Sequence, residues 1–170
     1  MPITSERLLF RRYHDDDFNF LMSLLSDAEV VRFIGDGKTR DENEGKNFLK
    51  WIYSSYESGE NLGLRLLVHK ADNTLVGHAG IVPQTIDGRE EMEIGYWISR
   101  KHWGKGYATE AAKTLLHFGS EQLGIQSFIS LIQPNNLSSQ HVAKKIGMAF
   151  DKEILLGGQR VYLYSIDTSR

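Results

Sequence analysis

Residues 93–112 constrain the fold more than any other part of the chain. They read EIGYWISRKHWGKGYATEAA, an alternating apolar segment followed by a basic turn and then by a helix-forming run. Gly104 and Gly106 lie in that turn. A strand that passes through a glycine turn into a helix leaves backbone N–H groups free at the helix N-terminus, where an anion can bind. The stretch therefore predicts a strand–turn–helix unit that binds a phosphate-bearing ligand.

Helices are predicted in the N-terminal third of the chain. After a strand at about 7–12, the run Asp15–Asp17 is expected to cap a helix with apolar residues at helical spacing. A short helix near 27–33 follows. Asp41 and Glu44 have the spacing of a capping box for a longer helix. One face of that longer helix carries Phe48, Trp51, Ile52 and Ser55.

Strands are predicted from residue 63 onward, where apolar residues begin to alternate. Asp72-Asn73 turns the chain into a returning strand at 74–82, and Asp87-Gly88 predicts a second hairpin turn into a strand at 90–98. In that last strand side chains alternate between the two faces of the sheet. Met92, Ile94, Tyr96 and Ile98 share one face, and Glu93, Gly95 and Trp97 share the other.

The C-terminal part predicts alternating helices and strands. A strand at 127–133 follows the helix after the glycine turn, and a helix at about 138–146 ends at Gly147. A hairpin of 148–156 and 159–166 completes the chain. This order predicts a mixed α/β sheet rather than a doubly wound one. The predicted buried stripe of the helix after the glycine turn consists of Ala108, Ala111, Ala112, Leu115, Leu116 and Gly119.

Composition excludes several classes of function. At 170 residues the chain is most simply one domain, 1–170, and its net charge of −2 lacks the basic field expected of a nucleic-acid-binding protein. No apolar run approaches a membrane span and no signal peptide is visible, so we expect a cytoplasmic protein without membrane contact. The absence of cysteine excludes a thiol nucleophile. The six histidines lack metal-site spacing, so no metal is expected.

Two familiar phosphate-binding patterns do not fit the glycine turn. The P-loop requires G-x-x-x-x-G-K-[ST], but Lys105 is followed by Gly106, and no glycine lies five residues before Gly104. The dinucleotide fingerprint G-x-G-x-x-G fails because Thr109 stands at its third glycine. A carboxylate about 20 residues further on is also missing.

A third pattern does fit. The segment WGKGYA resembles the acyl-CoA pyrophosphate loop of the GNAT superfamily of N-acetyltransferases, [QR]-x-x-G-x-[GA]. Gly106 and Ala108 match its last two fixed positions, while Trp103 replaces the leading Gln or Arg. TSERLLFRRYHDDDF, EIGYWISRKHWGKGYATEA and NLSSQHVAKKIGM extend the resemblance over nearly the whole chain. Together they resemble the branch of ribosomal-protein N-terminal (alanine/serine) acetyltransferases, which commonly has Trp at that position.

The resemblance implies the GNAT fold, an α/β fold whose mixed, mostly antiparallel central sheet is flanked by helices, and acetyl-CoA as cosubstrate. Backbone N–H groups from Trp103 to Thr109 and the helix dipole would then hold the pyrophosphate. Lys101 and Lys105 either add attraction or are solvated loop residues. In this family the strand before the loop parts from its neighbour to receive the cofactor arm. The residues expected to bind the cofactor are Ile98, Trp103, Gly104, Lys105, Gly106, Tyr107, Ala108, Thr109 and Asn136.

The reaction implied is attack of an amine on a thioester, without an acyl-enzyme. Glu93 is the candidate base, and its alternative is a structural role in shaping the pocket. The resemblance directs an N–H near Ile94–Tyr96 toward the thioester carbonyl. It also makes Ser139 the proton donor to the leaving thiolate and Asn136 a contact of the cofactor arm. Helix capping is the alternative for Asn136.

The amine acceptor is the least defined part of the prediction. The resemblance suggests a protein N-terminal α-amine, with Phe33, Trp51 and Tyr96 as candidate lining of its pocket. The alternatives are a small-molecule amine (a polyamine, an amino acid or an antibiotic) or a non-catalytic CoA-binding module. Dimers are common in this branch, so a homodimer is an open alternative to a monomer.

Overall fold

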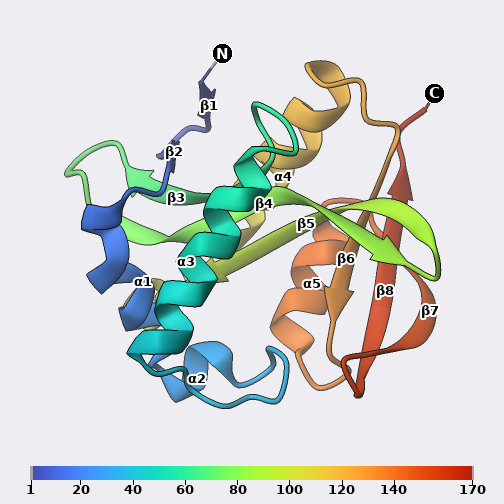
Figure 1. Ribbon diagram of the computed structural model, residues 1–170. Helices are drawn as coiled ribbons and strands as arrows, with labels where there is room; N and C mark the ends of the chain where they lie inside the picture. The colour runs from blue at the N-terminus through green and yellow to red at the C-terminus, as the bar shows by residue number, and fades with distance from the viewer. Residues whose placement is uncertain (1, 170) are drawn as a thin grey trace.

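The computed structural model describes residues 2–169, which form one eight-stranded mixed sheet (Figure 1). The strand order is β1-β2-β3-β4-β5-β6-β8-β7. Neighbouring strands are antiparallel except β5 and β6, which are parallel. The strands are β1 (Ile3–Thr4), β2 (Leu8–Arg12), β3 (Gly63–His69), β4 (Leu75–Ile86), β5 (Arg89–Ile98), β6 (Ser127–Ile132), β7 (Ala149–Leu156) and β8 (Gln159–Asp167).

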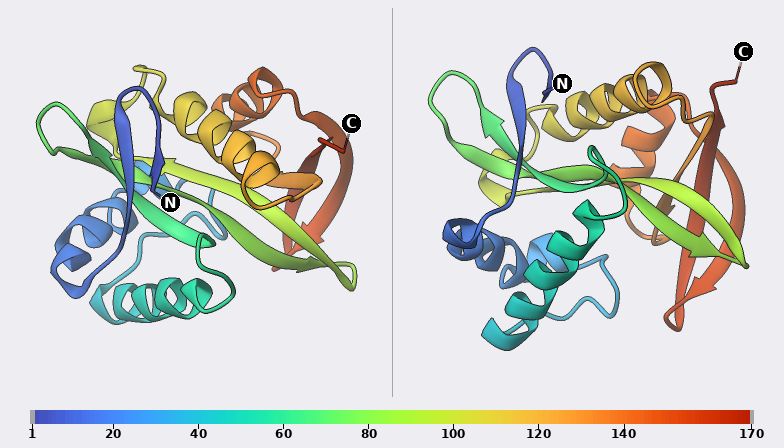
Figure 2. Two further views of the ribbon diagram at one scale, coloured as in Figure 1. Left: turned by 90° about the horizontal axis from the view of Figure 1, so that it is seen from above. Right: turned by 45° about the horizontal axis from the view of Figure 1, so that its top comes forward.

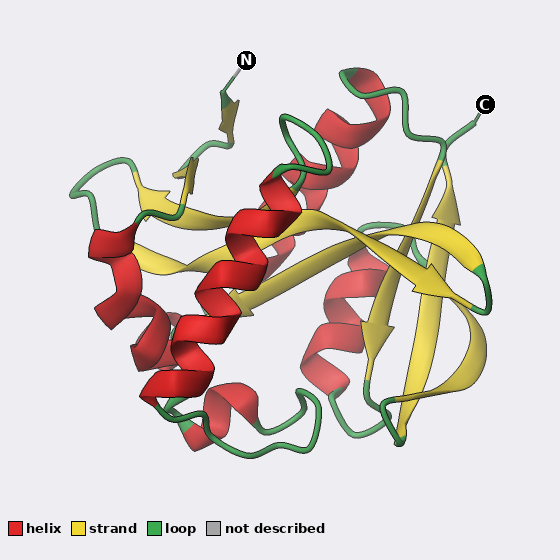
Figure 3. Cartoon of the chain, in the orientation of Figure 1, coloured by secondary structure: helices red, strands yellow, loops and turns green. Residues whose placement is uncertain are grey.

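Helices cover both faces of this sheet (Figures 2 and 3). One face carries α1 (Phe18–Leu25) and α3 (Glu42–Tyr56), with the four-residue α2 (Ala28–Val31) beside them. The other carries α4 (Tyr107–Glu121) and α5 (Leu137–Lys145). Two short 3-10 turns, η1 (Asp15–Asp17) and η2 (Arg100–His102), complete the order. Across residues 2–169, each helix falls short of the length and apolar character that a membrane crossing requires.

The two faces of β5 divide as its alternation predicts. Ile94 and Ile98 are buried in the core beneath α4 and α5. Trp97 instead packs against the cluster formed by α1, α3 and the strands beneath them. This division matters for function because residues of β5 reach both sides of the sheet within a few positions.

α4 packs on the sheet through a wider stripe than predicted. Ala111, Ala112, Leu115 and Gly119 are buried as expected, while Ala108 and Leu116 are partly buried against the same core. Tyr107 and Phe118 are buried as well. A Cβ at Gly119 would lie 2.7 Å from the Phe128 ring, so glycine permits this close approach of helix and sheet.

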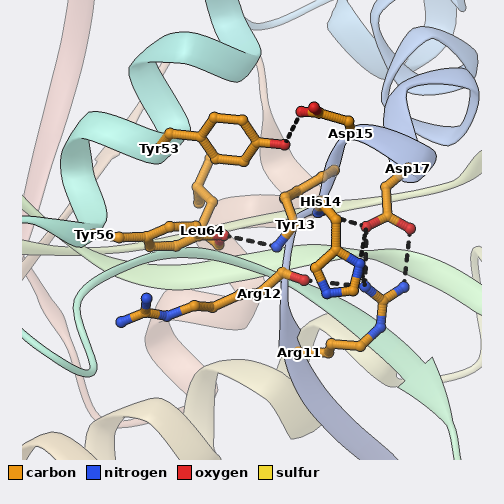
Figure 4. Close-up of polar contacts among 9 residues, drawn as sticks. All are labelled: Arg11, Arg12, Tyr13, His14, Asp15, Asp17, Tyr53, Tyr56 and Leu64. Carbon is orange, nitrogen blue, oxygen red and sulfur yellow. Dashed lines mark hydrogen bonds and ion pairs between the residues drawn. The ribbon is translucent and has the colours of Figure 1, made fainter.

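A polar network ties β2 and η1 to α3 (Figure 4). The Asp17 carboxylate accepts hydrogen bonds from Arg11 Nη1 and Nη2, each at 2.9 Å, and from the His14 N–H at 2.7 Å. Tyr53 donates its hydroxyl to Asp15 Oδ1 at 2.7 Å. Asp17 therefore does not cap α1 through its side chain, contrary to the expectation for Asp15–Asp17, because its carboxylate is directed to Arg11.

α3 begins with the predicted capping box of Asp41 and Glu44. Its buried stripe is shifted from the predicted face, because Leu49 is buried where Trp51 was expected. Trp51 is 43% exposed and contacts Phe48 edge-on.

Candidate active site

A cavity of about 510 Å³ opens where β5 and β6 separate. Within residues 2–169 the two strands pair at one position, Glu93 with Ile129, and then diverge (Figure 1). The gap between them is bounded by the end of β5, the end of β6, the glycine turn, the first turns of α4 and α5, and α2. The cavity thus lies at the C-terminal end of the central parallel pair.

The backbone of β5 presents polar groups to this cavity. Backbone groups of an antiparallel strand point alternately to its two sides. The Ser99 N–H donates to the Val76 carbonyl across the β4–β5 pair at 2.9 Å, and the register continues without a shift. The backbone N–H and C=O groups of Ser99, and of every second residue before it in β5, therefore face β4. The N–H and C=O groups of Ile94, Tyr96 and Ile98 face the opposite way, toward β6 and the cavity.

The glycine turn directs further N–H groups toward the cavity. Gly104 has a φ of 76°, and Gly106, the N-cap of α4, has a φ of 80°. This left-handed conformation is one that glycine adopts without steric cost. Trp103 is anchored beside it, because its Nε1–H donates to the Ile98 carbonyl at 2.7 Å. The first turn of α4 therefore points its free N–H groups and its dipole at the gap.

Most of the predicted cofactor residues are brought together here. Lys105 and Lys101 are instead exposed to solvent. Tyr107 is buried, and its ring also contacts Arg7, whose guanidinium carbon lies 4.3 Å from the ring centroid. The predicted residues that line the cavity are Ile98, Trp103, Gly104, Gly106, Tyr107, Ala108, Thr109 and Asn136.

The first turn of α5 brings Ser139 to the cavity. Asn136 is the N-cap of α5, and its side-chain oxygen accepts the Ser139 N–H at 3.2 Å. This oxygen therefore has the capping role that was the alternative prediction for Asn136. Tyr96 reaches the same turn from β5, donating its hydroxyl to the Ser139 carbonyl at 3.0 Å. Burial raises the pKa of Tyr96, which keeps its hydroxyl protonated. Sequence reasoning missed this second hydroxyl beside Ser139, although the alternation of β5 places Tyr96 on the face that α5 covers.

Glu93 lies at the last paired position of β5 and lines the cavity. Its Oε1 accepts a hydrogen bond from Gln84 Nε2 at 2.9 Å. Burial raises the pKa of Glu93, and the hydrogen bonds from Gln84 and the Leu131 N–H oppose that shift without cancelling it. A carboxyl whose pKa is raised in a cavity is suited to accept a proton near neutral pH.

Comparison with known proteins identifies the arrangement. Residues 7–149 match the model of the acetyltransferase (GNAT) domain family. The uncharacterized N-acetyltransferase YnaD of Bacillus subtilis (strain 168) is 32% identical over 148 residues, which cover 87% of this chain and 82% of that protein. The chain belongs to the GNAT family of acetyltransferases.

Solved acetyltransferase structures have the same fold. The acetyltransferase (GNAT family) from Bacillus anthracis matches with a TM-score of 0.82 and 30% identity, covering 100% of both chains. RimL, a ribosomal L7/L12 alpha-N-protein acetyltransferase in complex with coenzyme A, matches with a TM-score of 0.79 over 98% of both chains. At 16% identity that second likeness is one of fold. The expected GNAT fold is thus confirmed, and the protein is an acetyltransferase.

The GNAT family uses acetyl-CoA, and the cavity has the features that such a ligand needs. A Cβ on Gly104 would meet nothing within 4 Å, so the backbone there is open to a pyrophosphate. The N–H groups of Tyr96 and Ile98 face the cavity where β5 is no longer paired with β6. They can therefore hydrogen-bond to the extended arm of the cosubstrate. The phosphate end and the arm end of the cavity therefore both fit the cosubstrate of the family.

The remaining wall of the GNAT cavity comes from α2 and the residues after it. Glu29, Arg32 and Phe33 line the cavity there. Asp27, the N-cap of α2, also forms an ion pair with Arg100 of η2, with Oδ2 and Nε 3.0 Å apart. Of the three aromatic residues expected in an acceptor pocket, Phe33 and Tyr96 line the cavity, whereas Trp51 lies on α3 beside Phe48.

A partly buried ion pair fixes the first turn of α4 to the N-terminal segment. The Glu110 carboxylate accepts hydrogen bonds from Ser5 Oγ at 2.5 Å, the Arg7 N–H at 2.9 Å and Arg7 Nε at 2.7 Å. Burial alone would raise the pKa of Glu110, but the Ser5 and Arg7 hydrogen bonds outweigh burial and lower it. The charged carboxylate therefore stabilises the folded state.

Glu110→Gln is expected to lower the free energy of unfolding by about 1–3 kcal/mol at neutral pH, because hydrogen bonds to a charged group are lost. Since the folded-state pKa is lowered, this contribution is complete above the unfolded pKa and disappears as pH falls through the folded one. Urea unfolding of both proteins at several pH values measures it. Glu121→Gln, at the exposed end of α4, is the control. An equal deficit at neutral and strongly acidic pH would contradict the assignment to charge.

Proposed function

We propose that this protein is an N-acetyltransferase, a single domain over residues 1–170, which transfers an acetyl group from acetyl-CoA to a primary amine. The observation that carries the proposal is the gap between β5 and β6. It joins a glycine turn at a helix N-terminus to a carboxylate, Glu93, and a hydroxyl, Ser139, within one cavity. When bound, acetyl-CoA supplies a thioester carbonyl that an uncharged amine attacks directly in a ternary complex.

The cofactor end of the proposed site is built from backbone. N–H groups between Trp103 and Thr109 would bind the pyrophosphate, with the Thr109 hydroxyl as an additional donor. The β5 edge would pair with the extended arm through Ile98. The amide NH₂ of Asn136 would donate to the arm, because it is the carbonyl oxygen that caps α5.

The reacting end contains one group for each proton transfer. Glu93 would take the proton of the attacking amine, directly or through water, using carboxylate lone pairs that Gln84 and Leu131 leave free. Among the N–H groups near Ile94–Tyr96, that of Tyr96 faces the cavity and would stabilise the developing oxyanion. Such a donor is typically worth about 3 kcal/mol of the barrier.

Ser139→Ala is expected to lower turnover by about tenfold, less than the usual effect of a general acid, because a thiolate leaves readily even without protonation. Ser139→Thr retains a hydroxyl and is expected to recover most of the rate. Turnover is measured as release of the CoA thiol at saturating acceptor. An alanine variant with the turnover of the wild type would remove Ser139 from the mechanism.

The acceptor proposed is a protein N-terminal α-amine, supported by the fold likeness to RimL and by acidic groups at the acceptor wall. Glu29 and Glu93 line the cavity together with the cation Arg32, which lies between α2 and Phe33, and the two carboxylates would attract an ammonium group. Acetyl-CoA consumption with peptides of varied first residue, polyamines and free amino acids tests the proposal. Turnover with peptides and little with small amines supports it, and the reverse assigns a small-molecule acceptor.

Calorimetry with CoA separates catalysis from binding alone. Heat of binding together with acceptor turnover supports the transferase. Tight CoA binding with no turnover over the whole acceptor panel would favour a non-catalytic CoA-binding module. No heat at millimolar CoA would overturn the proposed cofactor site.

A further inference from the structure

We propose that Ser130 is a positioning residue that ends the β5–β6 ladder and thereby holds the cofactor channel open. The inference rests on the proposed function only in its consequence for CoA. The structural part concerns two backbone groups, the Ile94 carbonyl and the Leu131 N–H, which regular parallel pairing would join. Ser130 is 2% exposed and belongs to the wall of the cavity.

The ladder would continue past Glu93 if nothing intervened. Glu93 pairs with Ile129 in the parallel β5–β6 pair, and the backbone groups of Ile94 face β6 by the alternation of β5. In a regular parallel ladder the next bond runs from the N–H two residues after Ile129 to the carbonyl of Ile94. That N–H belongs to Leu131. Forming this bond would draw the end of β5 toward β6, across the space occupied by the cavity.

Pairing of β5 with β6 is recorded at Glu93 and Ile129 within residues 2–169, and side chains act on both groups that would form the next bond. Ser130 Oγ donates to the Ile94 carbonyl at 2.9 Å, a fully buried hydrogen bond. The Leu131 N–H acts on the carboxylate of Glu93, where it opposes the rise of the pKa that burial causes, and Gln84 Nε2 donates to the same carboxylate at 2.9 Å. Because each backbone group is satisfied, the strands separate without leaving a buried polar group unpaired. Separation at this point is therefore encoded in two side chains.

Loss of the Ser130 hydroxyl removes one side of this arrangement. The Ile94 carbonyl would then be a buried acceptor without a partner, which is costly. In a parallel ladder the donor that satisfies it is the Leu131 N–H, and that bond extends the ladder by one step. The extended ladder brings β6 toward the N–H of Tyr96, the group that faces the gap. Narrowing of the channel, rather than loss of a contact with the ligand, is the expected result.

The test is CoA affinity and the structure of Ser130→Ala. We expect the Kd for CoA, measured by calorimetry, to rise at least tenfold, and the KM of the acceptor to change much less. Ser165→Ala, which removes a hydroxyl from β8 on the other side of β6, is the matched control and should bind CoA as the wild type does. Ser130→Cys keeps nearly the same volume with a much weaker donor and should fall on the side of the alanine variant.

The two levels of the inference can fail separately. A crystal structure of Ser130→Ala with Leu131 N and Ile94 O within hydrogen-bond distance supports the ladder mechanism even if wild-type protein binds no CoA, a result that would reject only the proposed function. Unchanged CoA affinity in folded Ser130→Ala and Ser130→Cys would overturn the role of Ser130. So would a crystal structure with β5 and β6 still apart and the Ile94 carbonyl bound to water. If the alanine variant does not fold, the cysteine variant decides.

Discussion

Replacing Glu93 by Gln is expected to lower the turnover of acetyl transfer by roughly 100- to 10,000-fold, the usual contribution of a general base. Glutamine keeps the size of the side chain and an oxygen that can still accept from Gln84 or Leu131, but it cannot take a proton. Turnover at saturating acetyl-CoA and acceptor measures the effect. CoA affinity, measured separately, is expected to stay within a few-fold of the wild type.

The pH dependence distinguishes a base from a residue that only shapes the pocket. Glu93 has a raised pKa because it is buried, so wild-type turnover should rise as pH increases through a value above that of an ordinary glutamate. An α-amino group has a pKa of about 8 and supplies its own uncharged form at higher pH. The ratio of wild-type to variant turnover should therefore be largest between the raised pKa of Glu93 and the pKa of the acceptor amine. It should narrow above the pKa of the amine, where the acceptor is already uncharged, and should not grow further below the pKa of Glu93, where the wild type also lacks a base. A constant ratio across pH would contradict the assignment.

Although Glu93→Gln should lower turnover, it is not expected to lower thermal stability. An acid whose pKa is raised by folding destabilises the folded state once pH exceeds its unfolded pKa, because its charged form is disfavoured there. Glu93→Gln should therefore unfold at the same or a higher temperature than the wild type at neutral pH. That difference should vanish in acid, where both side chains are uncharged. A variant that is both inactive and strongly destabilised would indicate a structural role instead.

Gly106→Val is expected to weaken CoA binding at least tenfold, or about 1.4 kcal/mol. Gly106 has a φ of 80° at the N-cap of α4, a conformation that costs a β-branched residue on the order of 1–3 kcal/mol. Relief of that strain would turn the loop and redirect the N–H groups proposed to bind the pyrophosphate. Calorimetry with CoA measures the change.

Gly88→Val is the matched control for the backbone effect. Gly88 has a φ of 76° in the turn between β4 and β5, and a Cβ there would meet nothing within 4 Å. Both variants impose similar backbone strain, but only Gly106 adjoins the cavity. Both should lose some thermal stability, and only Gly106→Val should lose CoA affinity. Equal losses of affinity would show that the loop has no special role in binding.

Local features of the site could be predicted from the sequence. The glycine turn, the capping box of Asp41 and Glu44, and the hairpin turn at Asp87-Gly88 depend on residues close together in the chain, and the structure contains all three. The two faces of β5 follow from alternation alone. For this reason Glu93 and Tyr96 could be assigned to opposite sides of the sheet before their partners were known.

Long-range partners could not be predicted in this way. The bond from Ser130 to Ile94 spans 36 residues and that from Tyr96 to the Ser139 carbonyl spans 43, so no periodic pattern contains them. The separation of β5 and β6 was predicted only from the family resemblance. The side chains that act on the end of the ladder in this chain are those of Ser130 and Glu93. Ser130 lies 36 residues from its partner and Glu93 acts on the neighbouring strand, beyond the reach of any local pattern.

The length of β4 shows how context overrides a local rule. Proline normally ends a strand within a sheet, and the predicted strand ended at 82, whereas β4 continues to Ile86 with Pro83 opposite Met92. The nitrogen of Pro83 faces the β3 side. Because β3 begins at Gly63, opposite Ile81, β4 extends beyond β3 there, and no ladder bond is lost.

The cavity reaches both faces of the sheet, since Tyr96 and Ile98 approach it from the α4 side and Glu93 and Trp97 from the side of α1 and α3. In the proposed transfer the two reactants would therefore enter from opposite directions, so that neither has to depart before the other arrives. A compound in which CoA is joined through its sulfur to an acceptor amine would pass between β5 and β6. Its CoA part would bind the cofactor site and its amine part the acceptor site. Because the second end binds at high effective concentration, such a compound should bind far more tightly than either half.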